Sequence, residues 1–318
     1  MKYIKEIREG DSANGIYLCR KKEVGKKKSG EDYFALTLTD KTGSVDGKIW
    51  NTNNQGIAEF DSGDYVYIEG NTNLFNQRLQ VIINRLRKCN EGEYNPEDYV
   101  PSSSKSVSAM YREFMELIRS VKNPWLNRLL TDVFIEDKAV AKAFSEHTAA
   151  KQIHHAFRGG LLEHTLSVTK NCMAFADNYP ILNRDVLLTA AMLHDIGKVS
   201  ELSALPENDY TDEGQLLGHI YMGADFVGRR IDKIEGFPQK LRNEILHCIL
   251  AHHGKLEFGS PKRPALAEAI ALNMADDMDA KMETLGELFD TAQSDEGWLG
   301  YQKNFESNVR KTGKYEQE

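Results

Sequence analysis

The sequence predicts a multidomain protein in which a small all-β domain is followed by a larger all-α domain. Residues 1–90 contain short segments of alternating apolar and polar residues separated by turn-forming residues, a pattern typical of strands. Residues 91–107 combine two prolines and four serines with no hydrophobic period, which predicts a linker. In residues 108–318, apolar residues recur at helical spacing almost without interruption.

The composition is that of ordinary globular domains. The chain has 318 residues, of which 41% are hydrophobic and 28% charged, so it can form two cores. No apolar stretch approaches the roughly 20 residues needed to span a bilayer, and the N-terminus lacks the apolar core of a signal peptide. The four cysteines are far apart and form no C-x-x-C pair, which indicates reduced thiols. We therefore expect a cytoplasmic protein with no membrane partner.

The first domain is expected to be a five-stranded barrel. Tyr33–Thr39 and Ser44–Trp50 alternate clearly on either side of the turn Asp40–Gly43, which predicts a hairpin. Five short strands with a helix between the third and the fourth is the order of an OB-fold. The remaining elements are expected at Gly15–Cys19, Tyr65–Gly70 and Arg78–Ile83 for the strands and at Asn53–Phe60 for the helix.

Basic and aromatic residues of this domain are candidates for binding a nucleic acid. The net charge of −8 argues against a general phosphate-binding surface, so any such contact must be local. The segment Tyr33–Trp50 resembles strands 2 and 3 of nucleic-acid-binding OB domains, which present aromatic and basic side chains to single strands. Taken alone, clustered lysines are more typical of a solvated loop, and a single aromatic residue is more typical of a core or its rim. The candidate contacts are Lys26, Lys27 and Lys28, in the lysine-rich loop expected after the first strand, with Tyr33, Trp50 and Phe75.

The second domain is expected to be entirely helical. Its most apolar helix contains Val186–Leu193, a run with no glycine or proline, and is expected to stop at Gly197, since glycine is common at helix C-termini. The helices are expected at 109–120, 124–134, 137–145, 161–178, 183–196, 214–231, 238–254 and 264–288, with a last one near 298–310.

All nine histidines follow residue 146, and five of them occur with aspartates in a notable order. A buried imidazole or carboxylate needs a partner, and a metal ion is a natural one. Two divalent cations require a bridging carboxylate, several neutral imidazoles and open coordination positions, and this mixture suits manganese, iron, zinc or cobalt better than calcium or magnesium. Any single histidine here is more typical of a core or capping role, but the set predicts a metal centre. Its members are His164, His194, Asp195, His219, His252, His253 and either Asp276 or Asp277.

The order His, His-Asp, His, His-His, Asp resembles the HD-domain metal-dependent phosphohydrolases in their two-metal form. The resemblance implies that His164, His194, Asp195 and Asp276 bind the first metal ion. It also implies that Asp195 bridges to a second ion, whose other ligands are His219, His252 and His253. We expect Mn²⁺, with Co²⁺, Fe²⁺ or Zn²⁺ as alternatives.

The same resemblance suggests which residues take part in catalysis. His194 and Asp195 are expected at the centre of the reaction, and Lys198 matches a position that contacts substrate phosphate. The alternative role for Lys198 is that of a helix-end lysine interacting with the helix dipole. His147, His154, His155 and His247 are expected not to be ligands.

An OB domain followed by an HD domain, with the motifs Arg158–Thr165 and His252–Pro264, is similar to the YhaM-type 3′-5′ exoribonucleases. This implies hydrolysis of single-stranded RNA to nucleoside 5′-monophosphates, with single-stranded DNA as a second candidate substrate and a homo-oligomer as a candidate assembly. The alternatives are a phosphohydrolase of small or cyclic nucleotides and a binding protein with a degenerate HD domain. The Gly-Tyr-Pro signature of cyclic-di-GMP phosphodiesterases is absent after His253, and no ligand position of the pattern is lost.

Overall fold

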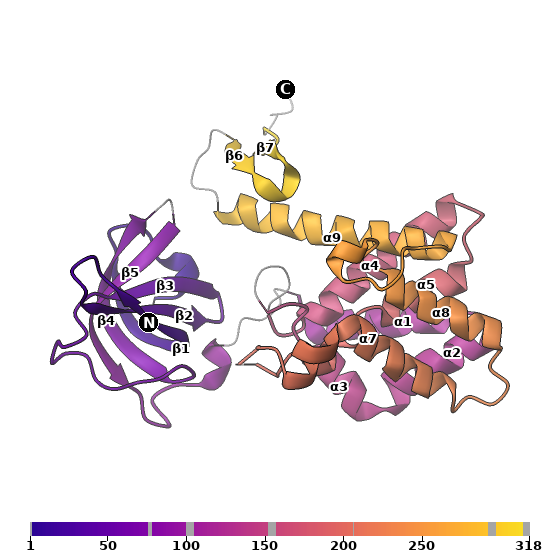
Figure 1. Ribbon diagram of the computed structural model, residues 1–318, viewed down its shortest axis with the longest axis horizontal. Helices are drawn as coiled ribbons and strands as arrows, with labels where there is room; N and C mark the ends of the chain where they lie inside the picture. Colours follow the sequence, from indigo (N-terminus) through magenta and orange to yellow (C-terminus); the bar gives the residue numbers. More distant parts are fainter. Residues whose placement is uncertain are drawn as a thin grey trace.

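The computed structural model describes residues 2–75, 78–99, 105–151, 157–205, 207–291 and 297–313. It has a β-barrel lobe and a helical lobe, and a small C-terminal hairpin follows the longest helix, α9 (Figure 1). Among the described residues, none of the helices is both long and apolar enough to cross a membrane.

The N-terminal lobe is a closed barrel with the strand order β1-β2-β3-β5-β4, as expected for an OB-fold. All neighbouring pairs are antiparallel except β3 and β5, which are parallel. Its core contains the fully buried side chains of Tyr17, Leu38, Ile49, Ile68 and Leu86. The strands are β1 (Ser12–Lys26), β2 (Asp32–Asp40), β3 (Gly43–Ile49), β4 (Tyr65–Phe75) and β5 (Arg78–Lys88).

The expected lysine loop is wrong in part, because β1 continues through it. The second half of β1 pairs with β2 from Lys21↔Thr37 to Lys26↔Asp32, so backbone pairing keeps this segment extended although its side chains are mostly exposed. Only Lys27 and Lys28 lie in the turn between the two strands. An exposed polar strand has no apolar alternation by which the sequence could reveal it.

The helix expected at Asn53–Phe60 is also wrong. The segment forms turns and a single bridge between Ile57 and Leu86. Asparagine side chains account for this, because Asn51 Oδ1 accepts from the Asn53 backbone N–H and Asn54 Oδ1 accepts from that of Gly56. Such local bonds stabilise turns in competition with a helix.

The C-terminal lobe packs its helices around one large core that includes Phe114, Phe134 and Phe144. Helix α4 packs against α5 and α9, and α5 also packs against α8, so α4 and α5 are central. The helices are α1 (Val107–Ser120), α2 (Pro124–Thr131), a π-helical turn (Asp132–Glu136), α3 (Lys138–Glu146), α4 (Gly160–Asn178), α5 (Arg184–Leu193), α6 (Lys198–Glu201), α7 (Asp212–Ile231), α8 (Gln239–Ala251) and α9 (Ala267–Thr291). Short 3-10 helices occur at Ile4–Glu6, Pro96–Tyr99, Leu256–Phe258 and Lys303–Phe305.

The helix expected near 298–310 is wrong. This segment is an antiparallel hairpin of β6 (Trp298–Gln302) and β7 (Ser307–Arg310). Gly300 has a φ of 74° and Glu306 a φ of 49°, and such left-handed residues cannot continue a right-handed helix.

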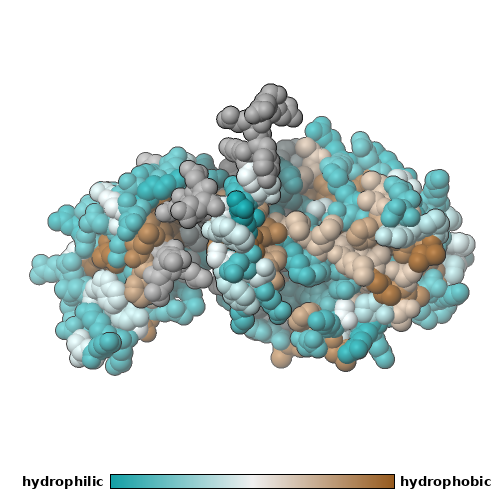
Figure 2. Space-filling model, turned by 90° about the horizontal axis from the view of Figure 1, so that it is seen from above, coloured by the Kyte–Doolittle hydropathy of each residue, from teal (hydrophilic) through white to brown (hydrophobic). Residues whose placement is uncertain are grey.

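Apolar side chains are exposed on one face of the helical lobe. Seen from above, hydrophobic side chains gather on this lobe among hydrophilic ones (Figure 2). The exposed apolar residues of α9 recur every four positions, which places them along one side of the helix. They are Ile270, Met274, Met278 and Met282.

Candidate metal centre and nucleic-acid interface

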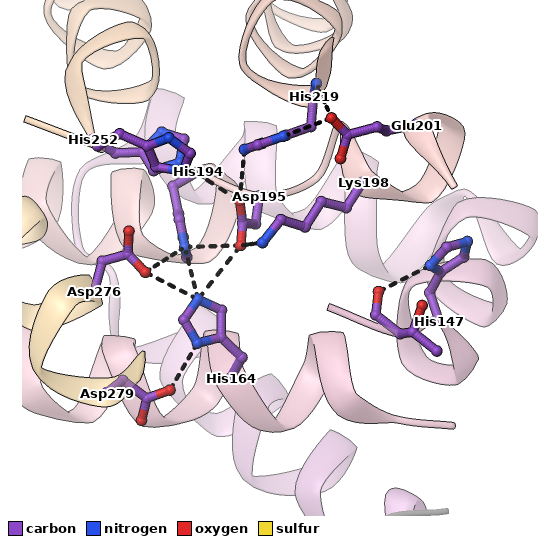
Figure 3. Close-up of polar contacts among 12 residues, drawn as sticks. His147, His164, His194, Asp195, Lys198, Glu201, His219, His252, Asp276 and Asp279 are labelled. Atoms are coloured by element: carbon purple, nitrogen blue, oxygen red, sulfur yellow. Dashed lines mark hydrogen bonds and ion pairs between the residues drawn. The ribbon is translucent and has the colours of Figure 1, made fainter. Parts of the chain in front are cut away.

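Five elements of the helical lobe bring the predicted ligands to one point in its interior (Figure 3). The candidate ligands occur on α4, at the C-terminal end of α5, within α7, immediately after α8, and on α9. His194 and His252 have no exposed surface. The seven residues are His164, His194, Asp195, His219, His252, His253 and Asp276.

One group of ligands consists of His164, His194 and Asp276. His164 Nε2 lies 3.2 Å from Asp276 Oδ1 and 3.3 Å from His194 Nε2. One ligand atom from each of the three residues lies within 4.8 Å of the others, a spacing at which a single cation could contact all three.

A second group consists of His219, His252 and His253, with ligand atoms again within 4.8 Å of one another. Asp195 Oδ1 lies 3.6 Å from the Nε2 atoms of both His219 and His252. In the described part of the chain, these three atoms are buried and make no hydrogen bond. Buried polar atoms without partners are costly, so this donor set fits a cation.

Asp195 lies between the two groups. Its Oδ2 atom is 3.4 Å from the Nε2 atoms of both His164 and His194, whereas Oδ1 faces the second group. The Lys198 Nζ atom is 2.7 Å from Oδ2. Burial raises the pKa of the Asp195 carboxyl, but Lys198 and His194 outweigh this and hold that pKa well below its usual range. Asp195 is therefore ionised and can offer one oxygen to each group.

The surroundings also bias the protonation of the imidazoles. Burial lowers the pKa of His164, but hydrogen bonds to three carboxylates raise it well above its usual value overall. Burial and a neighbouring imidazole lower the pKa values of His252 and His253, which keeps their rings neutral and able to bind metal.

The Nδ1 atom of each ligand imidazole lies within hydrogen-bonding distance of a fixed acceptor, so Nε2 is the atom presented to the centre. Three of these acceptors are backbone carbonyls 2.7 Å away: Ala191 for His194, Ile249 for His252 and Phe258 for His253. The other two are carboxylates, Asp279 at 2.7 Å from His164 and Glu201 at 2.9 Å from His219.

Sequence reasoning missed Asp279 and Glu201. Asp279 follows Asp276 by three residues on one helix, which places both on the same side, and that spacing could have indicated it. Glu201 offers no such signal, because its contact with His219 spans 18 residues.

Two glycines set the backbone around His194 and His219. Helix α5 ends at Leu193, and Gly197 has a right-handed φ of −64°, so it is not the helix-ending residue that the sequence suggested. A Cβ atom at Gly197 would lie 2.1 Å from the His219 carbonyl oxygen, so glycine permits the close approach of α7. Gly218 has φ 72° and ψ 152°, which kinks α7 immediately before His219.

The remaining histidines and the second aspartate lie elsewhere. Asp277 is exposed and pairs with Lys281 at 2.6 Å, whereas Asp276 faces His164. His247 Nε2 accepts from the backbone N–H of Ala265. His147 Nδ1 lies 3.1 Å from the Thr148 carbonyl oxygen, away from the centre (Figure 3). His154 and His155 lie outside the described residues.

On the barrel, Tyr33 and Trp50 form a pair with ring centroids 5.0 Å apart. Trp50 is 44% exposed, and Lys48, which was not predicted, places its Nζ atom 5.0 Å from the centroid of the Tyr33 ring. An aromatic pair of which one ring is exposed and the other half-buried, with a cation beside it, can stack on bases and neutralise a phosphate.

The other predicted nucleic-acid contacts are more scattered. Phe75 is 62% exposed at the end of β4. Lys26 pairs with Asp32 at 3.9 Å, and Lys27 pairs with Glu31 at 2.9 Å. Lys28 is exposed in the turn. Two of the three lysines thus already have acidic partners.

Comparison with known proteins gives matches to each lobe and to most of the chain. The family model of the HD domain matches residues 161–281, and that of an OB-fold nucleic acid binding domain matches residues 20–88. The 3′-5′ exoribonuclease YhaM of Halalkalibacterium halodurans is 32% identical over 288 residues, covering 90% of this chain and 89% of that protein. The proteins of the same name from Bacillus velezensis and Bacillus subtilis are each 31% identical, with 86% and 87% of both chains covered, respectively.

Proposed function

The chain belongs to the YhaM family of 3′-5′ exoribonucleases, and we propose that it shortens single-stranded RNA at a two-metal centre in its HD domain. This agrees with the resemblance drawn from the sequence motifs and with the OB-plus-HD architecture. The chain is a hydrolase that depends on divalent metal. The observation that best supports two ions is the position of Asp195, whose two oxygens face two different groups of ligands.

The residues present fit the proposed ions. His164, His194 and Asp276 would hold one and His219, His252 and His253 the other, with Asp195 shared between them. Bound divalent ions supply Lewis acidity, lowering the pKa of water and neutralising phosphate charge, which is worth several kcal/mol. We propose Mn²⁺, with Co²⁺, Fe²⁺ or Zn²⁺ as alternatives, because the donors are imidazoles and carboxylates.

Lys198 has a role beyond that of a helix-end lysine. Its ammonium group is paired with Asp195 at the centre, and its side chain is only 16% exposed. Burial lowers the pKa of Lys198, but the Asp195 carboxylate outweighs this and raises it, so the ammonium stays charged. An ammonium has three donors, so Lys198 can hold Asp195 in place and still donate to a non-bridging phosphate oxygen.

The barrel would bind the strand upstream of the scissile bond. Tyr33 and Trp50 offer stacking surfaces, Lys48 offers charge, and Lys26, Lys27, Lys28 and Phe75 lie at exposed or partly exposed positions elsewhere on the barrel. Binding of the strand by this domain raises the concentration of its 3′ end at the metal centre without taking part in the chemistry. The products are nucleoside 5′-monophosphates, and single-stranded DNA is a second substrate under the same proposal.

Location and assembly belong to the proposal too. The four cysteines, Cys19, Cys89, Cys172 and Cys248, are free and buried, as expected for the reducing cytoplasm. The exposed apolar residues of α9 offer a surface for a homo-oligomer. Light scattering after size-exclusion chromatography measures the number of subunits.

The test is a time course on 5′-labelled single-stranded RNA with Mn²⁺, beside the double variant His194→Ala/Asp195→Ala. We expect a ladder that shortens from the 3′ end, mononucleotide products, and no cleavage by the variant or after EDTA treatment. Intact RNA with hydrolysis of a small or cyclic nucleotide would remove RNA as the substrate. Equal cleavage by the variant and the parent would disprove the assignment of the centre.

A further inference from the structure

A hydrogen bond joins the barrel to the helical lobe. Arg20, on the barrel, donates from Nη2 to the backbone carbonyl of Lys151 at 2.7 Å and lies 3.5 Å from that of Asn208. Both carbonyls belong to the helical lobe, 131 and 188 residues further along the chain. In Figure 1 the loop between α6 and α7, which contains Asn208, is directed toward the barrel.

Arg20 points out of the barrel because β1 has a bulge there. The β1–β2 register runs from Cys19↔Leu38 directly to Lys21↔Thr37, so Arg20 is the extra residue without a partner on β2. The pairing of β1 with β4 also ends two residues earlier, at Leu18↔Tyr65. A bulge bends its strand and redirects the side chain at that position.

The receiving surface on the helical lobe is held together by Asn208. This residue is fully buried and has a φ of 45°, a left-handed conformation that is uncommon outside glycine. Its Nδ2 donates to the carbonyls of Ala150 and Lys151, and its Oδ1 accepts from the Thr148 hydroxyl. Asn208 thus fastens the segment 148–151 to the loop after α6, and Arg20 contacts both.

The same loop is fixed to the metal centre. A bridge between Leu202 and Tyr210 closes it, and the backbone N–H of Thr211 donates to the Glu201 carbonyl at 2.9 Å. Thr211 caps the N-terminus of α7, and the Glu201 carboxylate accepts from both the backbone N–H and Nδ1 of His219. The loop is therefore anchored beside the elements that position His219.

Arg20 is well suited to this contact. Burial lowers the pKa of its guanidinium and the Asp209 carboxylate opposes this, but arginine remains charged at every pH of interest. A charged donor to a neutral carbonyl in a partly buried site makes a stronger bond than a neutral pair, and its loss leaves an acceptor unsatisfied.

We propose that Arg20 is a positioning residue that fixes the OB barrel against the loop after α6, so that a bound strand is held in line with the metal centre. The role in cleavage rests on the proposed exoribonuclease function, whereas the contact itself does not. The barrel is then a rigidly placed guide and not a module on a flexible tether. A fixed guide gives a higher effective concentration of the 3′ end than a tether of the same length.

The test compares Arg20→Met, which removes the donors and keeps the length, with Arg20→Lys and with the control Arg87→Met. Arg87 is an arginine of the same barrel whose Nη2 pairs with Glu93 at 2.6 Å. Asn208→Gly is a second variant that tolerates the positive φ and removes the side chain joining the two segments. Spin labels at Lys5→Cys and Glu235→Cys, both exposed, report the distance between lobes, since the native cysteines are buried.

We expect a narrow distance distribution for the parent and Arg87→Met, a broad one for Arg20→Met and Asn208→Gly, and an intermediate one for Arg20→Lys. We compare kcat/KM for a 20-nucleotide RNA with kcat/KM for a dinucleotide. The ratio of the first value to the second should fall about 10-fold or more in Arg20→Met, because KM for the longer substrate rises. The kcat for the dinucleotide should not change. A broad distribution in the parent, or equally narrow ones in the parent and Arg20→Met, would overturn the proposal. Because this distance readout needs no RNA, it tests the contact even if the nuclease activity is absent.

Discussion

The contact between Asp279 and His164 gives a sharp test of the metal centre. Asp279 Oδ2 lies 2.7 Å from His164 Nδ1, and its side chain is 10% exposed. Asp279→Ala removes the acceptor that fixes the ring and its tautomer. Removing such a partner typically weakens metal binding by about 10–100-fold, or roughly 1.4–2.7 kcal/mol. The loss of one hydrogen bond to a charged group, about 1.5–3 kcal/mol, gives the same range.

The measurement is a calorimetric titration of metal-free protein with Mn²⁺, together with the Mn²⁺ dependence of RNA cleavage. Asp277→Ala is the matched control, because Asp277 lies two residues earlier on α9, is exposed, and pairs with Lys281 at the surface. We expect Asp279→Ala to need 10–100 times more Mn²⁺ and to recover most of its rate at saturation, and we expect Asp277→Ala to behave like the parent. Unchanged affinity in Asp279→Ala, or an equal loss in Asp277→Ala, would refute the reasoning.

Two further predictions concern stability. In thermal melts, Gly197→Ala should destabilise the protein by about 3 kcal/mol, the upper end for overpacking, because its Cβ would meet three backbone atoms of α7, at 2.1, 2.7 and 2.9 Å. A Cβ at Gly286 on α9 would meet nothing within 4 Å, so Gly286→Ala should be neutral or slightly stabilising in thermal melts. An equal loss of stability in the two glycine variants would contradict the explanation by backbone crowding. Asp137 pairs with Arg230 at 2.5 Å, and this hydrogen bond holds the pKa of the carboxyl below its usual value. Asp137→Asn should therefore lower the free energy of unfolding by about 1 kcal/mol in urea melts at pH 7. The difference in stability between variant and parent should shrink below about pH 4, because the parent's carboxyl then takes up a proton. A constant difference down to pH 2 would argue against the pairing.

The sequence was most informative where chemistry restricts the choice of residue. Buried imidazoles such as His194 and His252 occur in apolar helical sequence and need partners, so their order alone indicated a metal centre. The alternating strands β2 and β3 were equally clear, because one side of each faces the barrel core.

It was least informative where contacts between distant segments decide the outcome. The second half of β1 is extended because β2 pairs with it, and its exposed side chains carry no trace of that pairing. Glu201 and Arg20 act through partners 18 or more residues away, so neither has a local signal. The prediction that Gly197 ends the helix was wrong, because the helix ends at Leu193 and Gly197 instead permits the close approach of α7, a contact between distant segments.

The balance of charge at the centre supports the proposal of two cations. If the histidines are neutral, as metal binding requires, the four carboxylates of Asp195, Asp276, Asp279 and Glu201 and the ammonium of Lys198 together carry three negative charges. One divalent cation would leave the site negative, and it would repel a phosphodiester. Two divalent cations would give it one positive charge, which the single negative charge of a phosphodiester then balances. Under that proposal a polyanionic substrate is best accommodated when both groups of residues hold an ion, and the three carboxylates that raise the pKa of His164 reflect the same demand for positive charge.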